Sequence, residues 1–101
     1  MPKIFEYLGI VIMFYSNEHE PIHVHGKYQA CESKAEFIIE DGQIIEIVIK
    51  DVKGKKPLPK KQLKDFKNFT EKFKEDIVNK WVDYFVYHKS VSCIKIEGKV
   101  K

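Results

Sequence analysis

The first half of the chain carries short apolar runs separated by turn residues, which is typical of β-strands. Asp41-Gly42 lies between two of these runs, and this dipeptide favours a type I′ hairpin because both of its residues accept a positive φ. In the run after the turn, Ile45, Ile47 and Ile49 alternate with other residues and are expected to face the core. Four segments carry the strand pattern: Ile10–Tyr15, Ile22–Tyr28, Ala35–Glu40 and Gln43–Ile49.

The second half changes to a helical period after a lysine-rich linker, Asp51–Pro59. Seven apolar residues recur there about every 3.7 positions, as on one face of a helix. The pattern predicts one long helix, or two consecutive helices with a break near Asn68–Lys74. Val91–Ile96 then predicts a short strand at the edge of the sheet. The seven apolar residues are Leu63, Phe66, Phe69, Phe73, Ile77, Trp81 and Phe85.

These elements predict an α+β fold in a single domain, 1–101. A small antiparallel sheet of about four strands, with a C-terminal edge strand as an option, would pack against the one long or two consecutive C-terminal helices. The sheet half is expected over 1–50, the helical half over 57–89 and a tail over 98–101.

Composition places the chain among globular proteins, with 44% hydrophobic and 33% charged residues. The longest apolar run has six residues, whereas a membrane span needs about 20. The first residues lack a secretory h-region. Cys31 and Cys93 lie far apart and match neither a disulfide framework nor a zinc-knuckle spacing. We therefore expect a cytoplasmic protein that has no contact with a membrane.

Charge is divided unevenly along the chain. Residues 1–49 hold three lysines against eight acids, and residues 50–101 hold fifteen lysines against seven. This asymmetry favours an anionic partner for the second half, although a general compositional bias toward lysine would look the same. No arginine is present, which argues against base-specific DNA recognition through the guanidinium fork.

Three of the four histidines fall within seven residues, at His19, His23 and His25. If the chain is extended from Ile22 onward, His23 and His25 point to the same face, and His19 can fold back across the turn. Three imidazoles with an open fourth position suit a divalent transition metal, zinc above all. The same residues with Glu18 suit acid–base catalysis. A purely structural role, in hydrogen bonds to nearby carboxylates, is the third interpretation.

A run of lysines around the linker is the candidate anion-binding segment. Such residues can follow a phosphate backbone, helped by the N–H groups at the start of the helix. The alternative is an ordinary solvated surface. The candidate lysines are Lys53, Lys55, Lys56, Lys60, Lys61 and Lys64.

Together these motifs resemble a small prokaryotic family, domain of unknown function 4160. The family pattern is an initial Met-Pro, an acid-His-x-Pro-Pro-His-x-His motif, a Leu-Pro followed by basic residues, and a helix that ends around a Trp. Ile22 departs from it, since proline is usual there. The matching residues are Met1-Pro2, Glu18, His19, Pro21, His23, His25, Leu58-Pro59-Lys60-Lys61, Trp81 and Lys95-Ile96-Glu97.

The resemblance implies a protein partner and does not specify a reaction. Genes of the family often lie beside a gene for another small protein, which implies the toxin side of a toxin–antitoxin pair and a small cognate antitoxin-like protein. We therefore carry three hypotheses: a toxin-like protein that acts on RNA through the histidines and lysines, a non-catalytic protein or nucleic-acid binding module with structural histidines, and a metal-binding protein.

Overall fold

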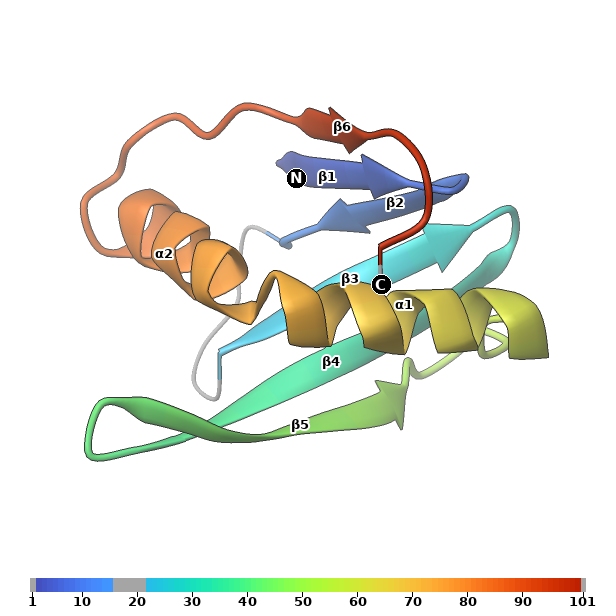
Figure 1. Ribbon diagram of the computed structural model, residues 1–101, viewed down its shortest axis with the longest axis horizontal. Coiled ribbons are helices and arrows are strands. Elements are labelled where there is room, and N and C mark those ends of the chain that lie inside the picture. Colours follow the sequence, from blue (N-terminus) through green and yellow to red (C-terminus); the bar gives the residue numbers. More distant parts are fainter. Residues whose placement is uncertain (1, 16–21, 101) are drawn as a thin grey trace.

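The computed structural model describes residues 2–15 and 22–100, which form one six-stranded sheet and two helices (Figure 1). The strands lie in the order β5-β4-β3-β2-β1-β6, so β5 and β6 are the two edges. The elements are β1 (Lys3–Tyr7), β2 (Ile10–Met13), β3 (His23–Tyr28), β4 (Cys31–Glu40), β5 (Gln43–Asp51), α1 (Lys60–Lys72), α2 (Lys74–Phe85) and β6 (Ile94–Ile96).

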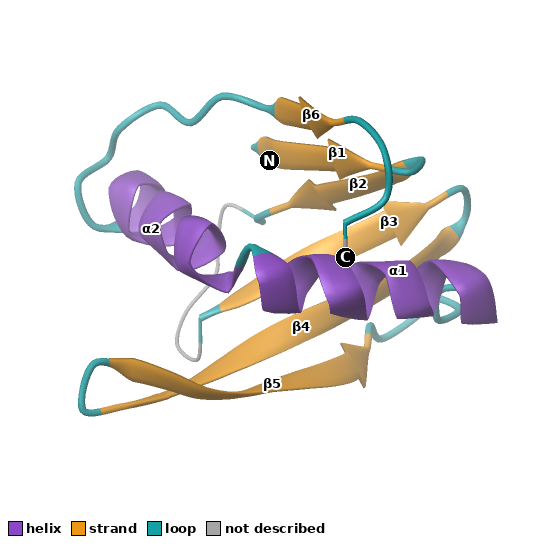
Figure 2. Ribbon diagram, in the orientation of Figure 1, coloured by secondary structure: helices purple, strands orange, loops and turns teal. Residues whose placement is uncertain are grey.

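The fold is α+β, as the sequence predicts, and its sheet has six strands where the sequence predicts about four and an optional C-terminal edge strand. An additional strand, β1, pairs with β2 at the start of the chain. Its five residues include a lysine and a glutamate, so no apolar run marks it. The C-terminal edge strand does form as β6, yet it joins β1 in parallel, and the sheet is mixed. The helices carry the chain back across the sheet, which brings β6 to the edge opposite β5 (Figure 2).

The hairpin between β4 and β5 has the predicted turn. Asp41 and Gly42 both have positive φ, 50° and 77°, as a type I′ turn requires. One expectation for β5 fails, however. The pairing between β4 and β5 is irregular at Ile38–Ile39, where the register skips Ile45. This bulge turns Ile45 out of the core, and it is 54% exposed, whereas Ile47 and Ile49 pack against the core.

The two helices are nearly continuous, and they meet at Phe73. Its φ of −107° and ψ of 20° end α1 and start α2, which is the two-helix arrangement with a break in the expected interval. Both helices lie against the same face of the sheet (Figure 1). Phe66, Phe69 and Ile77 of the apolar stripe are fully buried there.

One glycine sets the distance between α1 and the sheet. A Cβ atom built on Gly26 of β3 would lie 2.6 Å from the ring of Phe66, closer than real Cβ contacts. The strand therefore needs glycine at this position so that the helix can approach it. Among the described residues, no helix is long and apolar enough to cross a membrane.

Candidate functional site

Strand β3 places its histidines on the face of the sheet that the helices do not cover. Gly26 faces Phe66 of α1, and side chains alternate along a strand, so His25 and Lys27 point the other way. His23 lies two residues before His25 and shares its face. The two imidazole centroids are 5.3 Å apart.

The register of β3 with β4 surrounds these histidines with charge. His23 is opposite Glu36, His25 is opposite Lys34, and the next strand places Lys50 opposite Lys34. Opposed residues of neighbouring strands share a face. We call this polar surface the histidine face. It consists of Tyr15, His23, His25, Glu32, Lys34, Glu36 and Lys50.

The centre of the histidine face is a hydrogen-bonded chain of three side chains. His25 Nδ1 lies 3.0 Å from Glu32 Oε2, and the Tyr15 hydroxyl donates to the same oxygen. The rings of Tyr15 and His25 meet edge to face with centroids 4.1 Å apart. His25 is 5% exposed and Glu32 only 1%. A carboxylate this deeply buried needs such donors, because a buried charge without partners is costly.

These hydrogen bonds determine which nitrogen of the His25 ring carries the proton. An ionised carboxylate only accepts hydrogen bonds, so Nδ1 carries the proton that it donates to Glu32. With Nδ1 as the donor, the lone pair of neutral His25 is on Nε2. Glu32 also stabilises the imidazolium that forms when Nε2 is protonated.

A second carboxylate lies beside His23. Glu36 contacts Lys50 Nζ at 2.9 Å and Lys34 Nζ at 3.7 Å. Burial raises the pKa of Glu36, whereas the hydrogen bond and charge of Lys50 lower it. The charges of Lys34 and His23 add to this, so the net pKa is below its ordinary value and Glu36 is an anion at neutral pH.

Two predicted site residues, Glu18 and His19, lie outside the described residues. Within the described part of the chain, no group of three His, Cys, Asp or Glu side chains has a geometry that could hold a metal ion. The three-histidine site therefore stays a prediction.

The lysine-rich segment lies at the end of the sheet where β4 begins (Figure 1). The linker is bonded there: the Glu32 N–H donates to the Lys56 carbonyl at 2.8 Å, and the Leu58 N–H donates to Ser33 Oγ at 3.1 Å. The same residue, Glu32, thus bonds the linker through its backbone and His25 through its side chain. The candidate lysines, which are Lys53, Lys55, Lys56, Lys60, Lys61 and Lys64, are exposed around this end.

The family profile described as "Domain of unknown function (DUF4160)" matches residues 9–82, which is most of the chain. The chain belongs to the DUF4160 family. The match to DUF4160 runs from the turn before β2 into α2, so it contains every residue of the histidine face and leaves out β1 and β6. No curated protein and no solved structure matches the chain.

Sequence reasoning missed two central residues of this DUF4160 chain, Tyr15 and Glu32. Phe14 packs against Phe85 of α2 with ring centroids 5.7 Å apart, so its neighbour Tyr15 points to the opposite face. Glu32 becomes a neighbour of His25 only through the pairing of β3 with β4. The turn between β3 and β4 sets that register, and Gln29 in it has a φ of 55°. Positive φ in turns is typical of Gly and Asn, so a glutamine there does not predict the turn from sequence.

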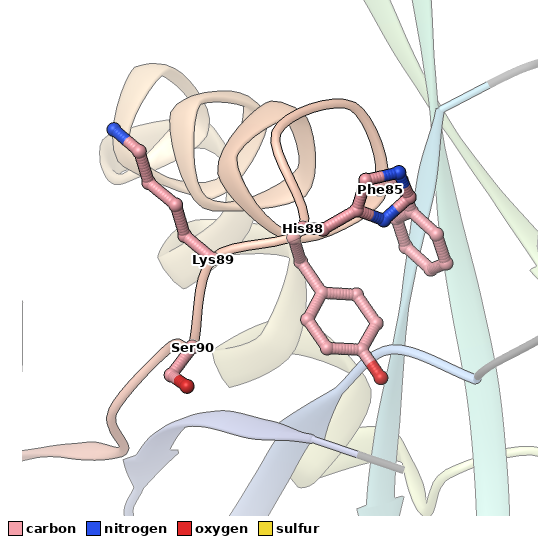
Figure 3. Close-up of a pocket in the computed structure, with 5 residues that line it drawn as sticks. Phe85, His88, Lys89 and Ser90 are labelled. Atoms are coloured by element: carbon pink, nitrogen blue, oxygen red, sulfur yellow. The ribbon is translucent and has the colours of Figure 1, made fainter.

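The remaining histidine lies apart from this site, at a hollow after the end of α2 (Figure 3). The hollow has a volume of about 370 Å³. His88 turns its ring toward Phe85, and Lys89 points the other way (Figure 3). His88 is exposed and has a φ of 55°. It is therefore a suitable control for experiments on His23 and His25. Residues lining the hollow are Tyr84, Phe85, His88, Lys89 and Ser90.

Proposed function

We propose that this DUF4160 protein is the toxin-like component of a toxin–antitoxin module, and that it binds and cleaves RNA at the histidine face. The observation that carries the proposal is the pairing of His25 with buried Glu32, 3.0 Å apart, beside a second histidine on the same face. A carboxylate-held imidazole is a common general base, because the carboxylate fixes its orientation and stabilises its protonated form.

RNA cleavage requires two proton transfers at one phosphodiester, and two neighbouring imidazoles can perform them. His25 Nε2 takes the proton of the ribose 2′-hydroxyl, whose oxygen attacks phosphorus. His23 gives a proton to the departing 5′-oxygen, so the products are a 2′,3′-cyclic phosphate and a free 5′-hydroxyl. The ring separation of 5.3 Å brings both groups within reach of one phosphate. His25 is 5% exposed, so the proposal requires that Nε2 belongs to the small exposed part of its ring.

The lysines of the same face supply the electrostatic part of the proposal. Lys27 follows His25 by two residues on β3, and Lys34 is directly opposite His25 on β4. Positive charge beside the scissile phosphate stabilises the charge that develops on its oxygens. The exposed lysines of the linker and of the start of α1, around the end of the sheet where β4 begins, would add contacts to the RNA backbone.

Induced expression in a bacterial host tests the proposal. The wild-type chain should arrest growth, and the double substitution His23→Ala/His25→Ala should relieve the arrest, while His88→Asn at the remote hollow should not. Circular dichroism of each purified variant checks that it is folded. Arrest that persists in the folded double variant would remove the site assignment, and no arrest by the wild type would remove the toxin role.

The pairing of His25 with Glu32 also favours a second candidate, a metal site. Metal-binding histidines usually donate their other ring N–H to a carboxylate, as His25 does. Zinc is the expected ion, with His19, His23 and His25 as predicted ligands. Elemental analysis of tag-free protein should then find close to one equivalent of zinc, lost in His25→Gln. Less than about a tenth of an equivalent, and no uptake of added zinc, would reject this candidate.

The third hypothesis, a non-catalytic binding module, makes a different prediction for the same variants. RNA would bind with a steep salt dependence, set by the number of lysines that contact phosphate, and would remain intact. His23→Ala/His25→Ala would then lower the melting temperature and leave RNA affinity largely unchanged.

A further inference from the structure

Strand β5 is a long edge strand, and none of the described strands pairs with its outer side (Figure 2). It has nine residues, contains no proline, and consists largely of isoleucine and valine. The other edge, β6, has only three residues. Edge strands present unpaired N–H and C=O groups, and proteins usually protect long ones with proline or several charges. β5 has no proline, its charged residues are Glu46, Lys50 and Asp51, and Ile45 beside its bulge is 54% exposed.

The charges of β5 select one way in which this edge can pair with itself. In an antiparallel pair of identical strands related by a two-fold axis, opposed side chains share a face, so the axis passes beside one residue. An axis at Glu46 or at Lys50 would place that charge against its own copy. An axis at Ile47 would place Glu46 against Val48 and Lys50 against Ile44.

An axis at Val48 places each side chain near the centre opposite a residue of opposite charge or another apolar residue. Glu46 then lies opposite Lys50 of the second copy, and the same ion pair repeats on the other side of the axis. Ile47 lies opposite Ile49, and Val48 lies opposite its own copy. Opposite charges and β-branched pairs at directly opposed positions stabilise strand pairing.

We propose that β5 pairs antiparallel with β5 of a second copy of this chain, with the axis at Val48. The two sheets join into one, and the helices of both copies lie on the same face of it. This proposal does not rest on the proposed activity at the histidine face.

Sedimentation equilibrium of the purified chain, from about 10 μM to about 1 mM, tests the pairing over the range expected for an interface of modest area. The wild type should reach the mass of two chains. Val48→Lys should keep the mass of one chain, since two like charges would meet at the axis. Within one chain the new lysine would lie opposite Glu36, which favours folding. Lys95→Glu, on the opposite edge strand, should behave as the wild type.

A charge exchange tests the register. Glu46→Lys alone and Lys50→Glu alone should each be monomeric, because like charges would then oppose each other twice. An equimolar mixture of the two variants should regain the mass of two chains, since every opposed pair joins a lysine with a carboxylate. A wild type that stays monomeric throughout, or a dimer unaffected by Val48→Lys and Glu46→Lys, would overturn the proposal. Lys50→Glu removes the ion pair with Glu36 and could disturb folding. Glu46 is exposed, so the result for Glu46→Lys alone still tests the register.

Discussion

At the scale of single residues, Glu32 connects the parts of the histidine face. Its side chain accepts from Tyr15 and pairs with His25, and its backbone N–H binds the linker. A carboxylate that is 1% exposed and still partnered in this way fixes both the direction and the tautomer of His25. The orientation of His25 is therefore decided by a residue that is almost completely buried, and Glu32 is best described as a positioning residue.

Glu32→Gln should lower the free energy of unfolding by about 1–3 kcal/mol, because the amide retains one acceptor oxygen and leaves a buried donor unsatisfied. Urea denaturation followed by circular dichroism measures this loss. Glu46→Gln, at an exposed position of β5, is the matched control and should change stability by less than about 0.5 kcal/mol. Equal stabilities for the two variants would contradict the bonding described for Glu32.

Glu36 gives a prediction about pH. Its pKa is lower in the folded chain than in the unfolded chain, so its interactions stabilise the fold above the ordinary value of 4.5 and are lost as the pH falls through the folded pKa. Lys50→Gln should raise the pKa of Glu36 and lower stability at pH 7, by less than about 1 kcal/mol because Lys50 is half exposed. Denaturation at several pH values between 7 and 3 should show that the free energies of unfolding of the wild type and the variant become more similar as the pH falls. A difference in the free energy of unfolding that increases as the pH falls would contradict this account of Glu36.

At the scale of elements, the sequence predicts local patterns well and long-range pairings poorly. The helical stripe and the Asp41-Gly42 turn depend on neighbours in sequence, and both are confirmed. The pairing of β6 with β1 joins the two ends of the chain, and no local signal announces it. The same distinction holds at the site. Alternation along β3 predicts that His23 and His25 share a face, whereas Glu32 becomes a neighbour only through the register of β3 with β4.

Gly26→Ala tests how β3 and α1 fit together. The added methyl group would meet the Phe66 ring at 2.6 Å, so the helix or the ring must shift. We expect a loss of about 1–3 kcal/mol, as for other overpacked cores. Thermal unfolding measures it, with the exposed neighbour Lys27→Ala as control. A stability within about 0.5 kcal/mol of the control would show that α1 is not held this closely.

At the scale of the whole molecule, the helices stabilise one face of the sheet and the histidine face occupies the other. The family match ends before β6, so the last strand lies outside the matched region. It nevertheless covers the outer side of β1: β6 pairs with β1, and the Val100 N–H donates to the Tyr7 hydroxyl at 2.9 Å. Of the two edge strands described, β5 has nine residues and β6 has three. The longer edge, β5, is therefore the natural place for association.

Removal of residues 91–101 tests the contribution of this final segment. Val91, Ile96 and Val100 pack against the core, so their loss should cost about 2–4 kcal/mol and expose the edge of β1. We expect a lower melting temperature and a greater tendency to aggregate, measured by thermal unfolding with light scattering. A truncated chain as stable as the full chain would contradict the role given to β6.

The central claim is that His23 and His25 cut RNA together, and a cleavage assay on labelled single-stranded RNA tests it most directly. The account predicts that wild type and His88→Asn produce 2′,3′-cyclic phosphate ends, and that His25→Gln and His23→Gln are each slower by about 10²-fold or more. It is contradicted if both variants, folded as judged by circular dichroism, cleave at the wild-type rate, or if the wild type leaves the RNA intact.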